Sequence, residues 1–350
     1  MSEPVGPLVA CIHHPPKVDL AALGRSLADL PRPVMLENVA FKESVKLRRA
    51  RQSPPVDPAL LSAAPVPDAA LLDVWERAEV LLALDLPEEH LDRMPRLRLV
   101  QAYSAGIEHL PVDALAARGV NLCHAAGAGA PAIAEFVFGR LIEQFRNLRA
   151  IDAMQREGAF HRPGGRSLAG RTLGIVGLGA IGSEVARLGR AFGMETIATR
   201  RRARPGETSD RVDHLSGPEG LDDLLGRSDV VVLCAPATPE TNDLIDEAAL
   251  ARMKPGAVLC NVARGALVDE AALIRALESE QLAAAILDVT RAEPLPAGDP
   301  LWTAPNLTLS PHCAIPPDAY DERLLALFAD NLRRYAMGQP LLNRVEPEAG

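Results

Sequence analysis

The sequence lacks several features that would each point to a particular class of protein. It contains no run of 18 uninterrupted apolar residues, so we expect no membrane-spanning helix. Its first residues, MSEPVGPLVACIHHPP, have no positive region followed by a long apolar segment, which predicts a cytoplasmic protein without a secretory signal. Positive charge is not in excess, because the net charge is −9, opposite in sign to a nucleic-acid-binding surface.

Paired cysteines are also missing. The five cysteines are odd in number and form no C-x-x-C pair, which favours reduced thiols over a disulfide framework or a zinc site. Four of them lie in or beside apolar, strand-like runs, where cysteine behaves as a small hydrophobic residue. His13 and His14 have no further ligand-like neighbours, so we expect no metal site.

One basic run, KLRRAR at 46–51, lies beside the proline-containing stretch 53–58. Because the run is short and the chain is acidic, we interpret it as a solvated surface rather than a nucleic-acid-binding patch. We therefore expect neither nucleic acid nor a membrane among the partners of this protein.

At 350 residues the chain is long enough to bury two hydrophobic cores. Short apolar runs alternate with helical patterns, which predicts an α/β fold with parallel sheets. In the first part of the chain, strands are expected at 8–12, 79–84, 97–102 and 120–123. In the second part, strands are expected at 173–176, 230–235, 258–262, 283–289 and 307–310.

Residues 171–202, RTLGIVGLGAIGSEVARLGRAFGMETIATRRR, have the pattern of a strand, a turn, a helix and a second strand. Gly177, Gly179 and Gly182 have G-x-G-x-x-G spacing, which permits a tight turn, close approach of backbone N–H groups to a pyrophosphate, and close helix–strand contact. Apolar residues at helical spacing follow, so the positive end of a helix would face the phosphates. This segment predicts that the protein binds a dinucleotide.

The end of the second strand indicates which dinucleotide is preferred. An acidic residue about 20 positions on usually binds the ribose of NAD, whereas an arginine accommodates the 2′-phosphate of NADP. Here Thr199 is followed by Arg200, Arg201 and Arg202. Guanidinium groups match phosphate oxygens, so we predict NADP(H) preference through Arg200 and Arg201, with NAD(H) still possible. The alternative is a solvated basic turn that tolerates either cofactor.

Two lobes are predicted, joined at the stretch AAGAGAP, residues 125–131. A long helix is expected to follow over 133–149, and a last helix over about 318–337 is expected to return to the first lobe. We therefore predict two Rossmann-like or flavodoxin-like lobes. An NAD(P)-binding lobe, residues 126–316, would be a doubly wound parallel sheet inserted in a substrate lobe made of residues 1–125 and 317–350.

Three ionisable residues follow three predicted strands of the second lobe: Arg264 in NVARG, Glu293 in LDVTRAEP and His312 in SPH. Parallel strands end at one edge of a sheet, so we expect all three at the mouth of the ligand crevice. Each could alone be structural: a surface arginine, a histidine packed near Cys313, or a carboxylate before Pro294. Three such residues at strand ends, beside a dinucleotide-binding turn, favour a shared catalytic site.

Together, the glycine loop, NVARG, LDV-x-x-x-EP and SPH resemble the D-isomer-specific 2-hydroxyacid dehydrogenases, over roughly residues 97 to 312. Within this family, the chain most resembles the glyoxylate and hydroxypyruvate reductases. The resemblance implies an oxidoreductase that transfers a hydride from NADPH to a small 2-oxoacid and, in reverse, oxidises a D-2-hydroxyacid. It also implies a homodimer built mainly on the nucleotide lobe.

The resemblance implies a role for each ionisable residue. Arg264 would bind the substrate carboxylate and carbonyl oxygen. His312 would contact the substrate and serve as the general acid and base. Glu293 would hold the imidazole of His312 and raise its proton affinity. A guanidinium can stabilise the negative charge that develops on the substrate oxygen, and a protonated imidazole can discharge it. Reduction is therefore expected to persist to lower pH than oxidation.

The resemblance also implies further contacts. Backbone N–H groups of Ala105 and Gly106, in YSAGI at 103–107, would bind the substrate carboxylate. The implied cofactor contacts are Leu178, Ala180 and Ile181 on the phosphates, Pro236 and Thr241 near the adenosine and linking phosphates, Val262, Ala263, and Asp288 at the nicotinamide amide. Asp288 ends an apolar strand, where a buried carboxylate needs a hydrogen-bonding partner.

Two other functions are compatible with the same fold. The first is an NAD(P)-binding redox sensor or regulatory protein, but a sensor has no need for the complete set of Arg264, Glu293 and His312. The second is a formate dehydrogenase, in which an amide would pair with the histidine, and Glu293 argues against it. The sequence AIPP at 314–317 would reshape the wall beside the substrate, so the identity of the substrate is left open.

Overall fold

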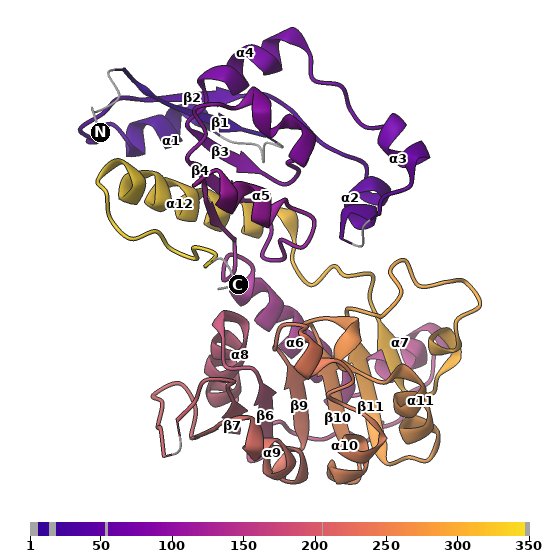
Figure 1. The fold of residues 1–350 in the computed structure, drawn as a ribbon. Helices are drawn as coiled ribbons and strands as arrows, with labels where there is room; N and C mark the ends of the chain where they lie inside the picture. The colour runs from indigo at the N-terminus through magenta and orange to yellow at the C-terminus, as the bar shows by residue number, and fades with distance from the viewer. Residues whose placement is uncertain (1–5, 14–18, 53–54, 205, 347–350) are drawn as a thin grey trace. The chain divides into compact units, whose positions relative to one another are not determined.

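The computed structural model describes residues 6–13, 19–52, 55–204 and 206–346. The chain divides into two compact units, drawn in Figure 1. Unit 1 comprises Met1–Ala128 and Pro317–Gly350, and unit 2 comprises Gly129–Pro316, so unit 2 is inserted between two segments of unit 1. Within the described residues, no helix is both long and apolar enough to cross a bilayer.

Unit 1 is built on a five-stranded parallel sheet with the order β2-β1-β3-β4-β5. Its strands are β1 (Leu8–Ile12), β2 (Val34–Asn38), β3 (Val80–Ala83), β4 (Leu99–Ala102) and β5 (Asn121–Cys123). Its helices are α1 (Leu20–Ser26), α2 (Val45–Arg51), α3 (Pro58–Ser62), α4 (Ala69–Arg77), η1 (Glu88–Arg93), α5 (Val112–Ala117) and the returning α12 (Pro317–Ala336). The sequence did not predict β2, because this partly exposed edge strand has no continuous apolar run.

Unit 2 contains a seven-stranded parallel sheet with the order β12-β11-β10-β9-β6-β7-β8. Its strands are β6 (Thr172–Val176), β7 (Glu195–Thr199), β8 (His214–Ser216), β9 (Val230–Leu233), β10 (Ala257–Asn261), β11 (Leu282–Leu287) and β12 (Leu307–Leu309). Its helices are α6 (Ala130–Phe145), α7 (Leu148–Glu157), α8 (Ala180–Ala191), η2 (Pro218–Gly220), α9 (Leu221–Arg227), η3 (Pro239–Thr241), α10 (Glu247–Arg252), η4 (Gly265–Leu267), α11 (Glu270–Glu278) and η5 (Pro300–Thr303). The strand order reverses between β6 and β9, which is where doubly wound sheets bind dinucleotides.

Helices cover both faces of the sheet in unit 2, and each face buries its own apolar cluster. Ile175 packs with residues of α6 and α8, such as Val137 and Val185. The next residue, Val176, points to the opposite face and packs with residues of α9 to α11, such as Leu273. Burial on both faces explains why these strands were recognisable as continuous apolar runs. The predicted α/β fold with two parallel, Rossmann-like or flavodoxin-like sheets is confirmed.

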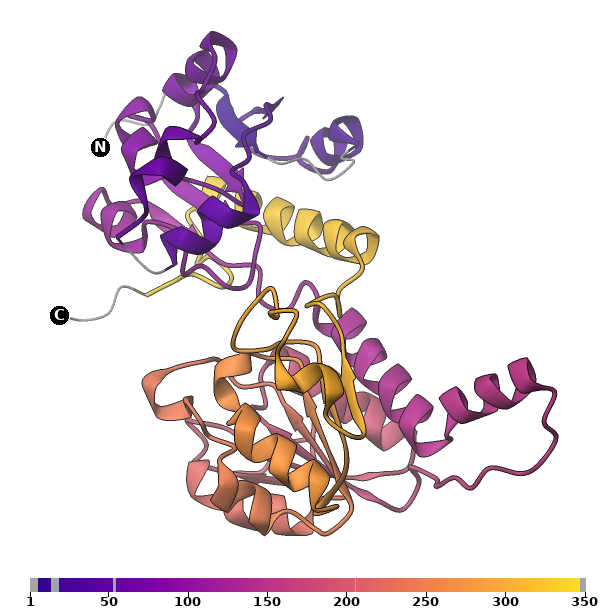
Figure 2. The same ribbon diagram turned by 90° about the vertical axis from the view of Figure 1, so that its right-hand side faces the viewer.

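The single helix predicted over 133–149 is wrong at its C-terminal end. Helix α6 ends at Phe145 and α7 begins at Leu148. Between them, Asn147 adopts a left-handed conformation with φ 52°, which interrupts a right-handed helix. Figure 2 shows that α7 consequently extends away from the sheet of unit 2.

The basic run at 46–51 lies in α2, and its interpretation as a solvated surface is wrong for two arginines. Arg48 Nε donates to Asp85 Oδ1 at 2.5 Å, and Arg51 Nη2 donates to Glu43 Oε1 at 2.8 Å. Both carboxylates are buried. The two arginines are three residues apart and share one face of the helix, so they meet acidic partners from elsewhere in unit 1.

Candidate active site

The glycine-rich turn lies between β6 and α8, as the sequence predicted. Gly177 has φ 102°, and a Cβ on it would lie 2.7 Å from the backbone nitrogen of Ala235. A Cβ on Gly182 would lie 2.2 Å from the carbonyl oxygen of Gly177. These two positions therefore require glycine. A Cβ on Gly179 would meet no atom within 4 Å, so the backbone there is open to an approaching group.

Helix α8 begins directly at this turn. Its N-cap residue, Gly179, makes no side-chain capping bond to the first helical turn, which includes Ala180 and Ile181. The preceding Leu178 is buried, and its N–H donates to the carbonyl of Thr199 at 3.1 Å, which fixes the turn against β7. A helix N-terminus without a side-chain cap favours an anion, so these residues fit the pyrophosphate of a dinucleotide.

The arginines predicted to bind a 2′-phosphate follow β7. The Arg200 guanidinium forms an ion pair with Glu207, a residue that sequence reasoning did not consider. Glu207 also accepts a hydrogen bond from the backbone nitrogen of Arg204 at 2.9 Å, and this bond and the Arg200 contact lower the pKa of the Glu207 carboxyl. Arg201 is exposed. A phosphate would therefore compete with Glu207 for the Arg200 guanidinium.

The three ionisable residues predicted for catalysis all follow neighbouring strands of one sheet. Arg264 follows β10, Glu293 follows β11 and His312 follows β12, and these strands are paired in parallel. The Nδ1 atom of His312 lies 2.9 Å from Glu293 Oε2. Arg264 is half-buried, and its charge acts on the imidazole of His312. The structure therefore brings all three to one edge of the sheet.

The surroundings of His312 favour its protonated form. Its pKa is raised above the ordinary value of 6.5 by the hydrogen bond to Glu293, and further by the negative charges of Glu293 and Asp288. Partial burial and the positive charge of Arg264 oppose this shift. The direction agrees with the prediction that Glu293 increases the proton affinity of the imidazole.

Asp288 anchors the loop that carries His312. It is 2% exposed, and its Oδ1 accepts from Ser310 Oγ at 2.6 Å and from the backbone nitrogen of Cys313 at 3.0 Å. Its Oδ2 accepts from the nitrogen of Ala314 at 3.0 Å, and its carbonyl accepts from the nitrogen of His312 at 2.8 Å. The chain itself supplies partners for this carboxylate, so its burial alone does not call for a nicotinamide amide, and that contact stays a prediction.

Asn261 shapes the loop that carries Arg264, although sequence reasoning gave it no role. It is buried at the end of β10, and its Nδ2 donates to the carbonyl of Arg264 at 2.9 Å. Its Oδ1 accepts from the nitrogen of Ala263 at 3.0 Å, which also fixes the buried Val262 between them. An amide at the end of the apolar run AVLCN was the available signal, because a buried amide needs partners.

The remaining predicted contacts lie in two other loops. Thr241 closes η3 through a capping box with Thr238, and its hydroxyl donates to the carbonyl of Pro236 at 2.8 Å. Ala105 and Gly106 follow β4 in unit 1, where Ala105 is exposed and Gly106 is half-buried. The other predicted site residues belong to unit 2.

Of the two histidines considered as metal ligands, the structure describes His13. His13 is buried and accepts a hydrogen bond from Trp75 Nε1 at 2.6 Å. His14 lies outside the described residues. Among the residues that the structure describes, no group of three or more His, Cys, Asp or Glu side chains could hold a metal ion.

The doubly wound sheet, the glycine turn and the histidine–carboxylate pair at the strand ends define a dinucleotide-binding oxidoreductase. The family model described as "D-isomer specific 2-hydroxyacid dehydrogenase, NAD binding domain" matches residues 138–314. A glyoxylate reductase from Aeropyrum pernix is 34% identical over 326 residues, which cover 90% of this chain and 93% of that protein.

Two solved structures are similar over nearly the whole chain. A D-isomer specific 2-hydroxyacid dehydrogenase from Xanthobacter autotrophicus, in complex with NADPH and MES, has a TM-score of 0.72 and 29% identity, covering 97% of this chain and 98% of its own. A glyoxylate reductase from Paecilomyes thermophila has a TM-score of 0.72 and 28% identity, covering 98% and 100%. The chain belongs to the D-isomer specific 2-hydroxyacid dehydrogenase family, as its motifs indicated. It is an NAD(P)-dependent oxidoreductase of 2-hydroxyacids or 2-oxoacids.

Replacing Glu293 by Gln should lower the pKa of His312, because the substitution keeps the shape of the side chain and removes the charge that favours the imidazolium. NMR titration of the imidazole signals measures this pKa, and a His312→Asn variant identifies the His312 signal among the eight histidines. Glu278→Gln, at an exposed position in α11, is the matched control. An unchanged pKa in Glu293→Gln would contradict the assignment of Glu293 as the main cause.

Proposed function

We propose that this protein is a 2-oxoacid reductase that uses NADPH and that acts on a small acid such as glyoxylate or hydroxypyruvate. In the reverse direction it would oxidise a D-2-hydroxyacid. The observation that carries the proposal is the 2.9 Å contact between His312 and Glu293 at the edge of the sheet that also carries Arg264. The names of the glyoxylate reductases from Aeropyrum pernix and Paecilomyes thermophila support this substrate class.

The chemistry is divided among three side chains. When bound at the turn between β6 and α8, a nicotinamide cofactor would supply the hydride for the carbonyl carbon of the substrate. The Arg264 guanidinium stabilises the negative charge on the carbonyl oxygen and binds the carboxylate. His312 then gives that oxygen a proton from Nε2, because Nδ1 is bound to Glu293.

The raised pKa of His312 sets the pH dependence of the two directions. Reduction needs the imidazolium, so kcat/KM for reduction is expected to be lost as the pH rises through that pKa. Oxidation needs the neutral imidazole as the base, so it is lost as the pH falls through the same pKa. A raised pKa therefore favours reduction over a wider range around neutral pH.

His312→Ala should lower kcat for reduction by about 10²- to 10⁴-fold, the usual contribution of a positioned general acid. The measurement is the loss of NADPH absorbance with glyoxylate, hydroxypyruvate and small alkyl 2-oxoacids. His214→Ala is the control, because His214 is an exposed histidine of the same unit, on β8. Full activity in His312→Ala would exclude the acid role. No NADPH oxidation by the wild type with any of these acids would favour a redox sensor instead.

We infer a preference for NADPH from the residues after β7. Arg200 and Arg201 stand where a carboxylate would otherwise bind a ribose, and both can contact a 2′-phosphate. The Xanthobacter autotrophicus structure in complex with NADPH supports this preference. The remaining predicted cofactor contacts, including Asp288 at the nicotinamide amide, belong to the same proposal.

Arg200→Asp should raise the Kd for NADPH by about 10- to 150-fold and leave the Kd for NADH nearly unchanged, because a charge-assisted bond contributes about 1.5 to 3 kcal/mol. Fluorescence titration with each nucleotide measures both constants. Glu207→Gln should act in the opposite direction, since it removes the carboxylate that competes for Arg200. Arg187→Asp, at an exposed arginine of α8, is the control. Equal NADPH affinity in the Arg200→Asp and wild-type proteins would refute the phosphate contact.

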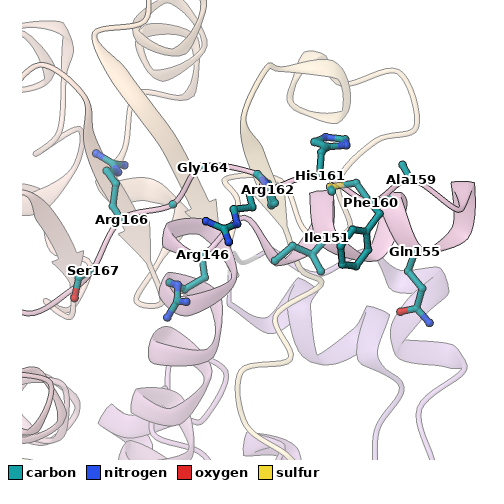
Figure 3. Close-up of a pocket in the computed structure, with 13 residues that line it drawn as sticks. Arg146, Ile151, Gln155, Ala159, Phe160, His161, Arg162, Gly164, Arg166 and Ser167 are labelled. Carbon is teal, nitrogen blue, oxygen red and sulfur yellow. The ribbon is translucent and has the colours of Figure 1, made fainter.

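We also infer a homodimer that forms through α7. No residue of this helix is buried, although Leu148 and Ile151 are apolar and are 39% and 42% exposed. Phe160, after the helix, is fully exposed. Figure 3 shows Ile151 and Phe160 lining the same hollow as Arg146 and Arg162. Exposed apolar side chains on a segment that extends from its unit favour contact with a second copy of the chain.

Ile151→Asp combined with Phe160→Asp should convert the proposed dimer to a monomer, because burying two carboxylates in an apolar contact is costly. Size-exclusion chromatography with light scattering measures the mass over a range of protein concentrations. Val66→Asp is the control, because Val66 is an exposed apolar residue of unit 1. A monomeric wild type, or a variant that remains dimeric, would refute a dimer formed through α7.

A further inference from the structure

Arg291 lies two residues before Glu293, and its side chain reaches the loop that follows Arg264. Its Nε donates to the carbonyl of Val268 at 2.9 Å, and its Nη2 donates to the carbonyl of Ala266 at 3.0 Å. Both carbonyls come within four residues after Arg264. One guanidinium therefore connects the loop that carries Glu293 with the loop that carries Arg264.

A third partner of this guanidinium is the carboxylate of Asp243, in the loop after η3. Asp243 has φ 52°, and its backbone nitrogen donates to the carbonyl of Ala266 at 2.9 Å. Asn242 Nδ2 donates to Asp243 Oδ2 at 2.6 Å. The carbonyl of Ala266 thus accepts from both Asp243 and Arg291, so the three groups form one connected network.

The backbones of the two catalytic loops are in direct contact at Gly265. A Cβ on Gly265 would lie 2.0 Å from the carbonyl carbon of Thr290 and 2.3 Å from the nitrogen of Arg291. The nitrogen of Thr290 is in turn 3.3 Å from Glu293 Oε1. A small shift between the loops would therefore move Glu293 relative to Arg264.

The Arg291 contacts are suited to fixing a geometry more than to stabilising the fold. The Arg291 side chain is 35% exposed and that of Asp243 is 43% exposed, and ion pairs this open to water contribute little stability. A guanidinium, however, presents several donors in a rigid planar arrangement. Three acceptors at fixed positions can therefore orient it, and through it the loop on which it stands.

We propose that Arg291 is a positioning residue that holds the Glu293 loop against the Arg264 loop. The network is defined by Arg291, Asp243, Ala266 and Val268. It fixes the position of the Glu293 carboxylate, which orients His312, relative to the Arg264 guanidinium, which binds the substrate. This inference rests on the proposed function, in which both loops act on one 2-oxoacid.

The test replaces Arg291 by Met, which keeps the aliphatic part of the side chain and removes all its donors. The kcat/KM for 2-oxoacid reduction should fall by about 10- to 100-fold, because misplacement by about 1 Å costs up to this much. The KM for the 2-oxoacid should rise because Arg264 binds the substrate less well. The kcat should fall because His312 is oriented less well. The Kd for NADPH, measured by fluorescence, should change less than kcat/KM, because the phosphate-binding turn between β6 and α8 lies outside the Arg291 network.

The pH profile gives a readout that a purely structural role would not change. Glu293, Asp288 and Arg264 are the charged groups that act on the imidazole of His312. If Glu293 is held less well, the pKa of His312 should fall, and the loss of reduction should begin at lower pH. Arg291→Lys should be intermediate, because one ammonium group cannot reproduce the planar set of contacts.

The matched control is Arg275→Met, because Arg275 is an exposed arginine of the same unit that pairs with Glu247 on the surface. It should keep the wild-type kcat/KM and pH profile. Wild-type kcat/KM and pH profile in Arg291→Met would overturn the positioning role.

Failure of the proposed function can be told apart from failure of this inference. If the wild type reduces no 2-oxoacid, NMR titration of His312 in the wild type and in Arg291→Met still tests the positioning role of Arg291. A lower pKa in the variant supports the positioning role, and equal values overturn it. If Arg291→Met does not fold, Asp243→Asn decides by the same titration, because asparagine tolerates the left-handed backbone and removes the charge.

Discussion

The chemistry of unit 2 depends on β10, β11 and β12 being paired neighbours that run in the same direction. This pairing makes three loops leave the sheet at one edge, although their ionisable residues are up to 48 positions apart in the chain, from Arg264 to His312. Two buried polar residues then shape the outer loops. Asn261 fixes the turn before Arg264 through its side-chain amide. The Asp288 carboxylate accepts hydrogen bonds from backbone N–H groups that follow β12. Rigid placement on strand ends is what an acid–base site requires.

The balance of charge around His312 follows from this placement. Glu293 contacts the ring directly and its hydrogen bond is the largest effect, which outweighs the opposing charge of Arg264, so the pKa of the imidazole is raised. A guanidinium close to an imidazole would otherwise disfavour a second positive charge. The carboxylates of Glu293 and Asp288 therefore favour a protonated imidazole at the same edge of the sheet as the Arg264 guanidinium.

Local sequence patterns predicted the buried strands and the glycine turn, because each has a recognisable run of residue types. Strands buried on both faces, such as β9 and β10, were recognisable as apolar runs. The short, partly exposed edge strands β2 and β8 were not. The glycine turn was predictable because Gly177 and Gly182 meet backbone atoms that no side chain could avoid.

Contacts between distant parts of the chain could not be predicted in the same way. The groups that donate hydrogen bonds to the Asp288 carboxylate lie 22 to 26 positions later in the chain. Arg48 pairs with Asp85, which is 37 positions away. Likewise, nothing in the pattern LDVTRAEP indicates that Arg291 reaches Ala266 and Val268. Such pairings depend on how strands and loops come together, which a single sequence does not state.

In the proposed mechanism, His312 and Arg264 act on the same substrate oxygen. A crystal structure of the protein with NADPH and oxamate, an analogue of a 2-oxoacid, tests it most directly. We expect His312 Nε2 and the Arg264 guanidinium within about 3.2 Å of one oxamate oxygen, with Nδ1 still bound to Glu293. Oxamate bound away from Arg264, or an imidazole that has left Glu293 and turned from the ligand, would contradict this mechanism.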